Sequence, residues 1–535
     1  MAISVGGAAV LLAALDTYVV VTLLTDMAAS MHVALNRLEQ ATPIVTGFLL
    51  GYVAGMPLLG GLSDKLGRRA VVQISLAGFA VGSALTAACM DISEYLSEYA
   101  EINPLHLLIA GRAVQGLAGG ALLPVTMALV ADLWSEERRP EILGTVGAAQ
   151  ELGSVLGPLY GFALAELVHW QGVFWVNVPL TLLAMVAVHF ALPGRKALTG
   201  ERRKVDVVGG LLLAASLGLL TVGLNNQNPR ESVLPPHGRE FIIAGTVVFV
   251  LFAGWQWVAR TKLIDLTGLR KTPFFAVLAA SFIAGAALLV TLLDIELFAK
   301  GVLRLEDNKD AALLLVRFLV ALPVGAVVGG YLARRLGLRG VTVAGFLIST
   351  LAYWLVSRWP IDVLSTRYEL LGISLPVFDT DLALAGLGLG LVIAPLSAAV
   401  LQILPAAQHG VASAGVVLAR TMGMLIGFAS LTAWGLHRFF EMTKDLQTPQ
   451  PPVEVITANN DGVVTAAEQA AIDAYNVLLA EYNAKVNDAL LTEYHQIFFA
   501  TAVCCLAAAV ISLAIHVRRA EAPAAVEAGE ATVTV

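Results

Sequence analysis

The sequence is poor in charged residues. Asp, Glu, Lys and Arg make up 14% of its 535 residues, whereas a soluble globular domain usually carries about 25%. Hydrophobic residues reach 58%, and apolar stretches of about 20 residues, each long enough to cross a hydrocarbon core of about 30 Å, recur along the chain. The composition therefore excludes soluble, secreted and nucleic-acid-binding proteins and indicates an integral membrane protein.

Cysteine is also scarce. The three cysteines, Cys89, Cys504 and Cys505, fall in apolar segments, so the chain offers neither a disulfide framework nor a zinc ligand set. None of the nine histidines forms a convincing pair with a carboxylate at the membrane interface, which argues against a membrane-bound enzyme such as an acyltransferase. We expect no metal site and no cofactor.

The apolar stretches predict an all-α protein with fourteen membrane-spanning helices. The first stretch lacks a basic N-terminal segment and carries a carboxylate, so we interpret it as a membrane helix rather than a cleaved signal peptide. The expected spans are residues 5–27, 42–62, 70–90, 104–130, 141–164, 173–192, 206–224, 240–259, 273–294, 311–332, 340–357, 380–403, 411–434 and 496–517.

Alternate loops of this topology are basic. The loop "DISEYLSEYAEINP" on the opposite side carries four acids and no base. Because basic loops are retained in the cytoplasm, both termini are expected there. Nineteen of the 33 Lys and Arg residues lie on that side, at 65–69, 138–139, 195–204, 260–271, 334–339 and 518–519.

The spacing of the spans predicts two six-helix bundles separated by two extra helices. The charged link "PGRKALTGERRKVD" joins the sixth span to the seventh, and a second series of spans begins near residue 273. We expect an N-terminal bundle at 1–195, two linker helices at 196–272 and a C-terminal bundle at 273–535. Residues from about 520 to 535 are expected to form a disordered cytoplasmic tail.

The segment "GGLSDKLGRR" follows the second expected span. Its glycines allow helices to approach closely, and it sets one carboxylate among three basic residues, so it can hold two bundles together on the cytoplasmic side. An ordinary basic loop is the alternative. The residues expected in this cytoplasmic gate are Gly60, Asp64, Lys65, Gly67, Arg68 and Arg69.

This segment resembles the signature between the second and third helices of the major facilitator superfamily. "RAVQGLAGG" resembles that family's fourth-helix motif, and "WQGVFWVNVP", "VDVVGGLLL" and "GLGLGLVIAPLSAAVLQILPAAQHGVASAGVVLARTMG" resemble its fourteen-helix drug:proton antiporter branch. The resemblance implies two bundles that rock in alternating access. "GAAQELGSVLGPLYG" resembles the fifth-helix antiporter motif, with the helix-packing residues Gly153, Gly157, Pro158 and Gly161.

The second half repeats the gate segment imperfectly. "GGYLARRLGLRG" occupies the place that corresponds to "GGLSDKLGRRA". When the two segments are aligned on Gly67 and Gly337, Arg334 replaces Asp64. Because only the first copy keeps mixed charges, we expect the gate to act asymmetrically and to close the cytoplasmic side when the carrier faces outward.

A few charged residues lie inside the expected spans. Asp16 falls near mid-span and Glu151 precedes "GSVLGP", although an ionised carboxylate costs about 3 kcal/mol there on insertion scales. We interpret both as proton-coupling residues, with a structural hydrogen bond as the alternative. Arg112 and Arg420 are the expected charge partners, and the resemblance puts Arg112 within reach of Asp16 or Glu151. Asp294, at the outer end of the ninth span, is expected to be solvated.

The last span follows an unusually long polar helix. Nothing breaks the helical pattern between residues 465 and 518, and about fifty residues at 1.5 Å rise give roughly 80 Å, well beyond a bilayer. We expect a periplasmic helical hairpin over about 435–495 that guides an apolar substrate or docks an acceptor; a rigid spacer is the alternative. The expected contact residues are Phe439, Met442 and Leu446 on one helix and Ile472, Tyr475, Leu479, Tyr482 and Val486 on the other.

Three segments narrow the resemblance to one group within the superfamily. "AISVGGAAVLLAALDTYVVVTLL", "AAQELGSVLGPLYG" and "AAQHGVASAGVVLARTMGMLIG" resemble the mycobacterial triacylglyceride exporters of this superfamily. The resemblance implies a proton-driven exporter in the bacterial inner membrane that hands lipid to a periplasmic lipid-binding lipoprotein, and we expect a monomer. A broad multidrug:proton antiporter is the alternative. The linker at 358–379, rich in strand formers, predicts an additional outer β-hairpin.

Overall fold

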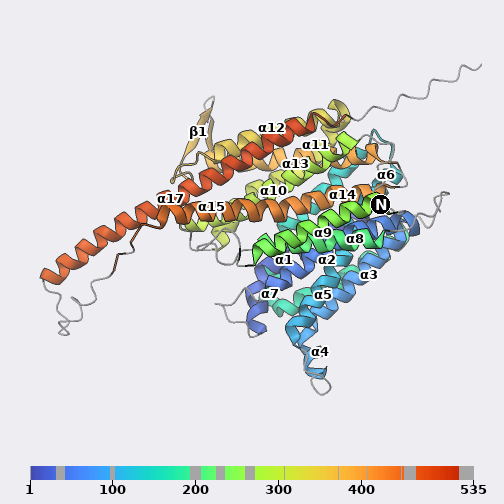
Figure 1. Ribbon diagram of the computed structural model, residues 1–535, viewed down its shortest axis with the longest axis horizontal. Coiled ribbons are helices and arrows are strands. Elements are labelled where there is room, and N and C mark those ends of the chain that lie inside the picture. The colour runs from blue at the N-terminus through green and yellow to red at the C-terminus, as the bar shows by residue number, and fades with distance from the viewer. Residues whose placement is uncertain are drawn as a thin grey trace, which may run out of the picture.

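Helices make up most of the protein in the computed structural model (Figure 1). The structure describes residues 2–31, 42–96, 103–192, 206–224, 235, 237–259, 271–305, 308–370, 373–405, 408–447, 449–450 and 466–516. The expected all-α fold class is confirmed. The helices are α1 Ala2–Ser30, α2 Thr42–Leu66, α3 Arg68–Ala87, α4 Cys89–Leu96, α5 Pro104–Gly119, α6 Leu122–Leu133, α7 Arg139–Ala191, α8 Val207–Leu224, α9 Gly238–Val258, α10 Lys271–Gly301, α11 Asn308–Leu336, α12 Leu338–Val356, α13 Val377–Ile403, α14 His409–Met422, η3 Gly423–Gly427, α15 Phe428–Thr443 and α17 Ala466–Ser512.

The helices are apolar enough for a polytopic membrane protein. Within the described residues, 11 helical segments are long and apolar enough to cross a membrane, and two shorter apolar helices cover residues 4–17 and 208–224. The number of fourteen spans stays a prediction, as do the expected domain boundaries. The expected cytoplasmic tail, the link at 193–205 and the turn at 451–465 lie outside the described residues.

Two irregularities mark the long helices at defined residues. α7 contains the spans expected at 141–164 and 173–192, and its helical geometry breaks at Val168 and His169, whose φ is +55°. The span expected at 411–434 contains the π-helix η3 between α14 and α15. A Cβ added at Gly423 would collide with the carbonyl of Phe282 on α10, so the backbone there has no room for a larger residue.

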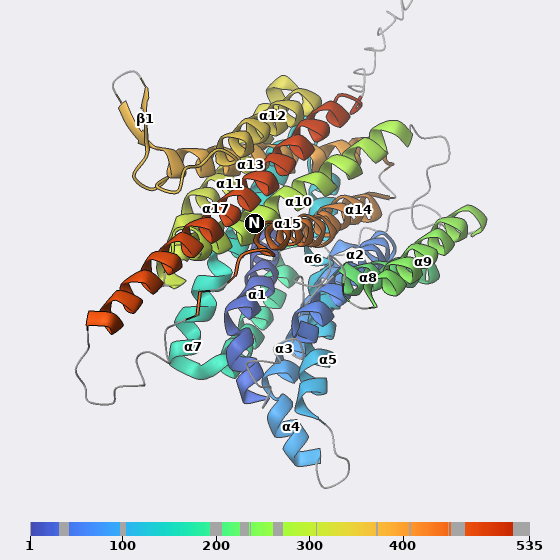
Figure 2. The ribbon, with the colours of Figure 1, turned by 60° about the vertical axis from the view of Figure 1, so that its left-hand side comes forward.

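Two groups of helices pack among themselves and then against each other. Before residue 192, α1 packs on α7, and α2 and α3 pack on α5; after residue 271, α11 and α12 pack on α13, and α17 packs on α10 and α12. The groups meet where α2 contacts α14 and where α7 contacts α11. We call the end at which α2 meets α14 the latch end. Both views show α4 and the free end of α17 pointing away from it in different directions (Figures 1 and 2).

The other end of the C-terminal half, the hairpin end, carries the expected β-hairpin. Strands β1 Arg367–Leu370 and β2 Ile373–Pro376 pair antiparallel, with Arg367 opposite Pro376. Asp381 at the start of α13 anchors them, because its carboxylate accepts hydrogen bonds from Tyr368 Oη at 3.2 Å and Trp359 Nε1 at 2.8 Å. Burial and the neighbouring Asp381 raise the pKa of Tyr368 to about 12, so its hydroxyl remains a donor at neutral pH.

α17 is the long terminal helix that the sequence predicts. Its 47 residues correspond to about 70 Å, and its N-terminal part extends well beyond the other helices (Figure 1). It ends at Ser512 rather than near residue 518, and α15 ends at Thr443, before the expected stop at "TPQPP". The expected contact residues on α17 are half-buried, as are Phe439 and Met442 on α15 and Leu446 just beyond its end. Val477 and Leu478 are 67% and 56% exposed.

Glycines let α2 and α5 touch backbone to backbone, a packing that small residues permit in membranes. A Cβ added at any of four positions would collide with a carbonyl oxygen of the facing helix. These close approaches pair Gly51 with Ala113, Gly55 with Leu117, Gly116 with Phe48 and Gly120 with Tyr52.

Substitution of Gly116 by Ala should therefore destabilise the N-terminal half. The added methyl group has no space to enter, and overpacking of this kind costs about 1–3 kcal/mol. Thermal unfolding in detergent, followed by the fraction of monodisperse protein, measures the effect. Gly254→Ala on α9 is the matched control, because nothing lies within 4 Å of the added Cβ; equal melting temperatures for the two variants would contradict the prediction.

Candidate functional site

Asp16 lies at the meeting point of three helices. Only 1% of this α1 residue is exposed. Its Oδ2 accepts a hydrogen bond from Nη1 of Arg112 on α5 at 2.7 Å, and its Oδ1 accepts one from Nδ2 of Asn177 on α7 at 2.7 Å. The expected partner Arg112 therefore pairs with Asp16 rather than with Glu151, and both carboxylate oxygens of Asp16 have a donor.

Arg112 is held by more than its ion pair. Its Nη1 also donates to Oε1 of Gln115 at 2.6 Å, and Nε2 of Gln115 donates to Oγ of Ser83 on α3 at 2.8 Å. The guanidinium lies 4.1 Å from the ring centre of Phe48 on α2, an attractive arrangement of a cation over an aromatic face. Arg112 thus keeps favourable contacts when the charge on Asp16 changes.

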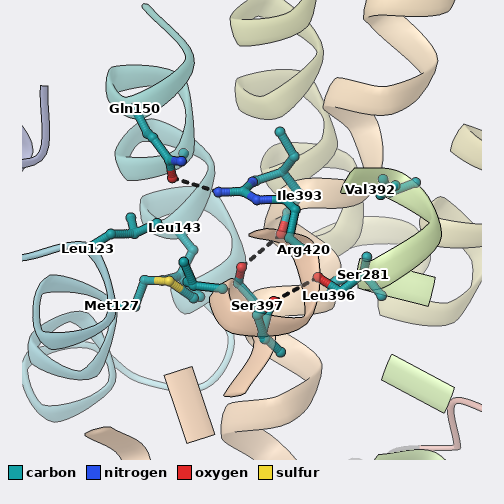
Figure 3. Close-up of a pocket in the computed structure, with 14 residues that line it drawn as sticks. Leu123, Met127, Leu143, Gln150, Ser281, Val392, Ile393, Leu396, Ser397 and Arg420 are labelled. Atoms are coloured by element: carbon teal, nitrogen blue, oxygen red, sulfur yellow. Dashed lines mark hydrogen bonds between the residues drawn. The ribbon is translucent and has the colours of Figure 1, made fainter. Parts of the chain in front are cut away.

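Glu151 and Arg420 form a second buried ion pair, and this pair joins the two halves. Arg420 on α14 places Nη1 3.3 Å from Oε1 of Glu151 on α7, and their side chains are 9% and 3% exposed. Nη2 of Arg420 donates to Oε1 of the neighbouring Gln150 at 2.6 Å (Figure 3). Arg420, one of the two expected charge partners, therefore contacts Glu151 and comes from the other group of helices.

A small cavity lies beside this pair. Its volume is about 20 Å³, which is room for about one water molecule. Arg420, Gln150, Ser281 and Ser397 supply its polar groups, and Figure 3 shows Gln150 and Arg420 pointing toward each other across it. The remaining lining is mostly aliphatic. A lipid cannot enter this space unless the helices move apart.

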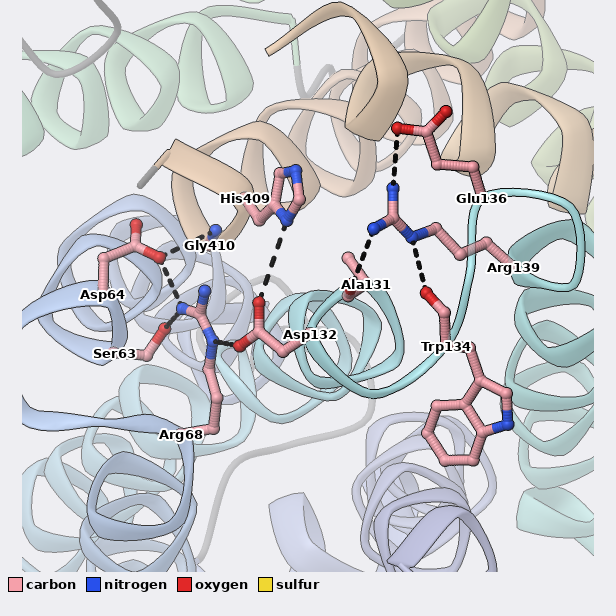
Figure 4. A network of polar contacts seen from close by, with 10 residues as sticks. All are labelled: Ser63, Asp64, Arg68, Ala131, Asp132, Trp134, Glu136, Arg139, His409 and Gly410. Atoms are coloured by element: carbon pink, nitrogen blue, oxygen red, sulfur yellow. Dashed lines mark hydrogen bonds and ion pairs between the residues drawn. The ribbon is translucent and has the colours of Figure 1, made fainter. Parts of the chain in front are cut away.

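Arg68 organises a polar network at the latch end (Figure 4). Its Nη1 donates to Oγ of Ser63 at 2.6 Å and pairs with Oδ1 of Asp64 at 2.5 Å, while its Nε donates to Oδ2 of Asp132 on α6 at 2.9 Å. The gate segment thereby joins α2, α3 and α6. Gly67 between α2 and α3 has a φ of +95°, which favours glycine.

The same network reaches the C-terminal half. The backbone N–H of Gly410 on α14 donates to Oδ1 of Asp64 at 3.1 Å, and Nδ1 of His409 lies 3.8 Å from Oδ1 of Asp132. Gly60 and Gly410 are in direct backbone contact, since a Cβ added to Gly60 would lie 2.9 Å from the carbonyl oxygen of Gly410. We call the contacts of Gly60, Asp64, Arg68, Asp132, His409 and Gly410 the latch.

Lys65 and Arg69, the other two residues expected in the gate, lie at its margin. Lys65 is exposed and Arg69 is half-buried, and neither forms an ion pair with a described residue. The structure thus brings together Gly60, Asp64 and Arg68 and leaves these two bases outside the latch.

The second copy of the gate segment also reaches across the interface. Gly337 has a φ of +87°, close to that of Gly67, so the expected repeat is present in the backbone. Arg334, which replaces the acid, places Nη1 3.2 Å from Oε2 of Glu141 at the start of α7. Close beside it, a Cβ added to Gly330 would collide with the carbonyl of Pro140. Each copy of the gate segment therefore contacts the opposite half, the first through the acidic Asp64 and the second through the basic Arg334.

The fifth-helix glycine motif lies against α1. A Cβ added to Gly153 would lie 2.7 Å from both the Cβ of Ala14 and the carbonyl oxygen of Leu11, which explains the close packing of α7 on the helix that carries Asp16. Gly157 and Gly161 are also buried. The side chain of Pro158 lies outside the described residues.

Asp294 is buried, so the expectation that it is solvated is wrong. The residue lies on α10 and is 1% exposed. Asp294 is buried because α17 packs along α10. α17 thereby covers this residue, which the sequence predicts at the outer edge of a span.

Several polar residues of these networks were not predicted from the sequence. Asn177, Gln115 and Gln150 are single polar side chains in apolar helices, and each bonds to one of the four charged residues. The available signal was their polarity within a span, because an unpaired amide is costly there. Asp132 and His409 lie next to loops, where sequence alone does not distinguish a buried charge from a solvated one.

Comparisons with solved structures indicate a transporter fold. The proton:xylose symporter XylE bound to 6-bromo-6-deoxy-D-glucose matches with a TM-score of 0.54 at 15% identity, covering 94% of each chain. The human organic anion transporter MFSD10 matches with a TM-score of 0.54 at 16% identity, covering 90% of this chain and 98% of that one. At these identities the likeness concerns the fold alone.

Relatives found by sequence comparison are much more similar to this chain than these solved structures. A triacylglyceride transporter of Mycolicibacterium hassiacum is 49% identical over 532 residues, covering 99% of this chain and 94% of that protein. A triacylglyceride transporter of Mycobacterium tuberculosis is 49% identical over 525 residues, covering 98% and 95%. Residues 7–428 match the family described as the Major Facilitator Superfamily. The chain therefore belongs to the Major Facilitator Superfamily and is a membrane transporter rather than an enzyme.

Proposed function

We propose that this chain is a proton-coupled exporter that moves triacylglyceride-like lipid from the inner membrane towards the periplasm by alternating access. The lipid substrate is proposed from the names of the full-length relatives at 49% identity. No cofactor is needed in this proposal, because the proton gradient supplies the energy.

The buried pair of Asp16 and Arg112 is the observation that carries the proposal. Both side chains are at most 1% exposed, and an unpaired charge in such surroundings is unfavourable by several kcal/mol. A proton that reaches Asp16 removes its charge and weakens its attraction for Arg112, so the side-chain link between α1 and α5 depends on protonation. Glu151 can act in the same way on Arg420, and that pair spans the two halves.

The latch supports the proposed direction. The expected excess of basic residues assigns the latch end to the cytoplasm. The backbone contact between Gly60 and Gly410 and the ion pair between Arg334 and Glu141 hold the halves together at that end. These contacts support a state that is closed to the cytoplasm. In the proposed cycle Asp16 takes up a proton from the periplasm when the carrier faces outward and releases it to the cytoplasm after the carrier has returned to the inward-facing state.

The small central cavity supports a lateral route for the lipid. With about 20 Å³, it holds no acyl chain, so lipid enters between helices from the bilayer as the halves move apart. The projecting part of α17 then offers an apolar surface, including Val477 and Leu478, along which the lipid leaves the membrane. A periplasmic lipid-binding lipoprotein is the proposed acceptor, and the exporter acts as a monomer.

Replacing Asp16 by Asn should abolish export. The amide keeps the shape of the side chain but cannot release a proton, so lipid transfer from proteoliposomes to an acceptor under an imposed proton gradient should fall to the level of protein-free vesicles. Folding should survive, because the proposed cycle itself passes through an uncharged Asp16. The control is Asp26→Asn, an exposed acid on the same helix. Normal export by the Asp16 variant would remove the coupling role.

Efflux of cationic dyes without lipid transfer by the unmodified protein would favour a multidrug antiporter.

Replacing Asp64 by Asn should slow export severalfold. Asp64 loses the charge that binds Arg68 and weakens its acceptor for the Gly410 N–H, so the latch end closes less often. The initial rate of proton-driven lipid transfer measures this effect. Lys65→Ala alters an exposed neighbour outside the latch and should leave the rate unchanged. Unaltered transfer by the Asp64 variant would show that the latch is a packing contact only.

Deleting whole turns of α17 from within residues 466–490 should reduce lipid transfer to the acceptor while membrane insertion continues. The deletion shortens the apolar surface beyond the membrane without altering the ion pairs in the spans. Glu481→Ala is the control, since it breaks only an exposed pair with Lys485 at 2.8 Å. If the shortened protein transfers lipid at the original rate, the projecting helix serves only as a spacer.

A further inference from the structure

Two carboxylates are buried together where α10, α15 and α17 meet, away from both ion pairs of the site. Asp294 on α10 is 1% exposed and Glu493 on α17 is 3% exposed. Glu493 lies against α15, because its Oε1 is 3.2 Å from the position of a Cβ added to Gly435. It is also close enough to Asp294 for the two negative charges to repel each other.

Neither carboxylate is fully satisfied. Oδ2 of Asp294 and Oε2 of Glu493 are buried and have no hydrogen-bond partner. An ionised carboxylate at such a position would normally be matched by a cation, as Asp16 and Glu151 are here. Among the described residues, no cation pairs with either oxygen.

The neighbouring helices direct their charged and titratable groups elsewhere. Tyr494, the next residue of α17, lies beside both carboxylates and brings a neutral phenol. The other charged and titratable groups have separate partners within the described chain. On α17 and α15, His495 contacts the carbonyl of Trp359, and Arg438 and His437 contact Glu441. The remaining contacts are Arg317 of α11 with Asp379 of α13, Asp381 of α13 with Trp359, Tyr353 of α12 with Thr291, Arg420 of α14 with Glu151, and Arg304 with Asn487 of α17.

A proton is the ligand that suits such a pair. Two ionised carboxylates in a dry site repel each other and have lost their hydration, so both cannot remain charged. One bound proton leaves a single negative charge on the two acids and removes their repulsion, as in other sites where two neighbouring acids hold one proton.

We propose that Asp294 and Glu493 share one bound proton in the folded protein and that this proton holds the root of α17 against α10. The pair is a proton-binding site distinct from Asp16 and Glu151. Loss of the proton puts two negative charges between the helices and drives them apart. The proton binding stands by itself, whereas its part in export rests on the proposed function, because α17 is the helix proposed to release the lipid.

Infrared difference spectra of the full-length protein in lipid nanodiscs test the shared proton. A protonated-carboxyl band should appear in the unmodified protein on going from alkaline to mildly acidic pH. Both Asp294→Asn and Glu493→Gln should lose the same component of this band, since each leaves only one acid of the pair. Asp488→Asn, an exposed acid on the same helix, and Asp16→Asn should keep that component. Its persistence in either variant of the pair would overturn the proposal.

The distance between the helices provides a second measurement. Spin labels at Leu297 on α10 and Val503 on α17, both exposed, should move apart as the pH rises in the otherwise unmodified protein. In Glu493→Gln the distance should not depend on pH, because the neutral amide leaves no second negative charge to repel Asp294. A distance that is independent of pH before this substitution would overturn the role of the proton in holding α17. Neither measurement depends on lipid transport, so a failure of export alone would count only against the proposed function.

Discussion

The burial of negative charge in an apolar helix bundle is the constraint on which this structure depends. A carboxylate that leaves water must find a cation, a set of donors or a proton. Asp16 has Arg112 and Asn177, and Glu151 has Arg420. Because the first pair lies within one half and the second joins the halves, the state of each acid bears on a different set of helix contacts.

Close helix packing gives these pairs their mechanical effect. Gly153 brings α7 onto α1 beside Asp16, and Gly60 and Gly410 bring α2 onto α14 at the latch end. Where backbones touch, a small change in the separation of two helices breaks several contacts together, so the packing favours discrete arrangements over gradual deformation. The π-helix next to Arg420 adds a local irregularity of a kind that is frequent at functional sites.

Much of the fold could be predicted from the sequence, because the length and low polarity of a membrane-spanning helix can be recognised in the sequence. The helices, the repeated gate segment with Gly67 and Gly337, the β-hairpin and the long α17 were all predicted from composition and motifs. The pairing of Arg112 with Asp16 was left open between two acids, since the order of residues along one helix does not fix which neighbour it faces.

The least predictable features depend on contacts between segments far apart in the chain. Asp294 is buried only because α17, some two hundred residues later, packs against α10. The sequence also placed Arg334 outside any latch, whereas its charge meets Glu141 on the opposite half. In both cases the deciding neighbour belongs to another helix, and hydropathy along one helix carries no information about it.

The unbroken course of α17 has a mechanical consequence. A helix of 47 residues, about 70 Å long, behaves as a lever whose fulcrum lies where it is packed among α10, α12 and α15. A tilt of a few degrees that barely disturbs side chains near the fulcrum sweeps the distant tip through several ångströms. Sub-ångström adjustments inside the bilayer are thereby amplified into a displacement large enough to present or withdraw an entire surface outside it.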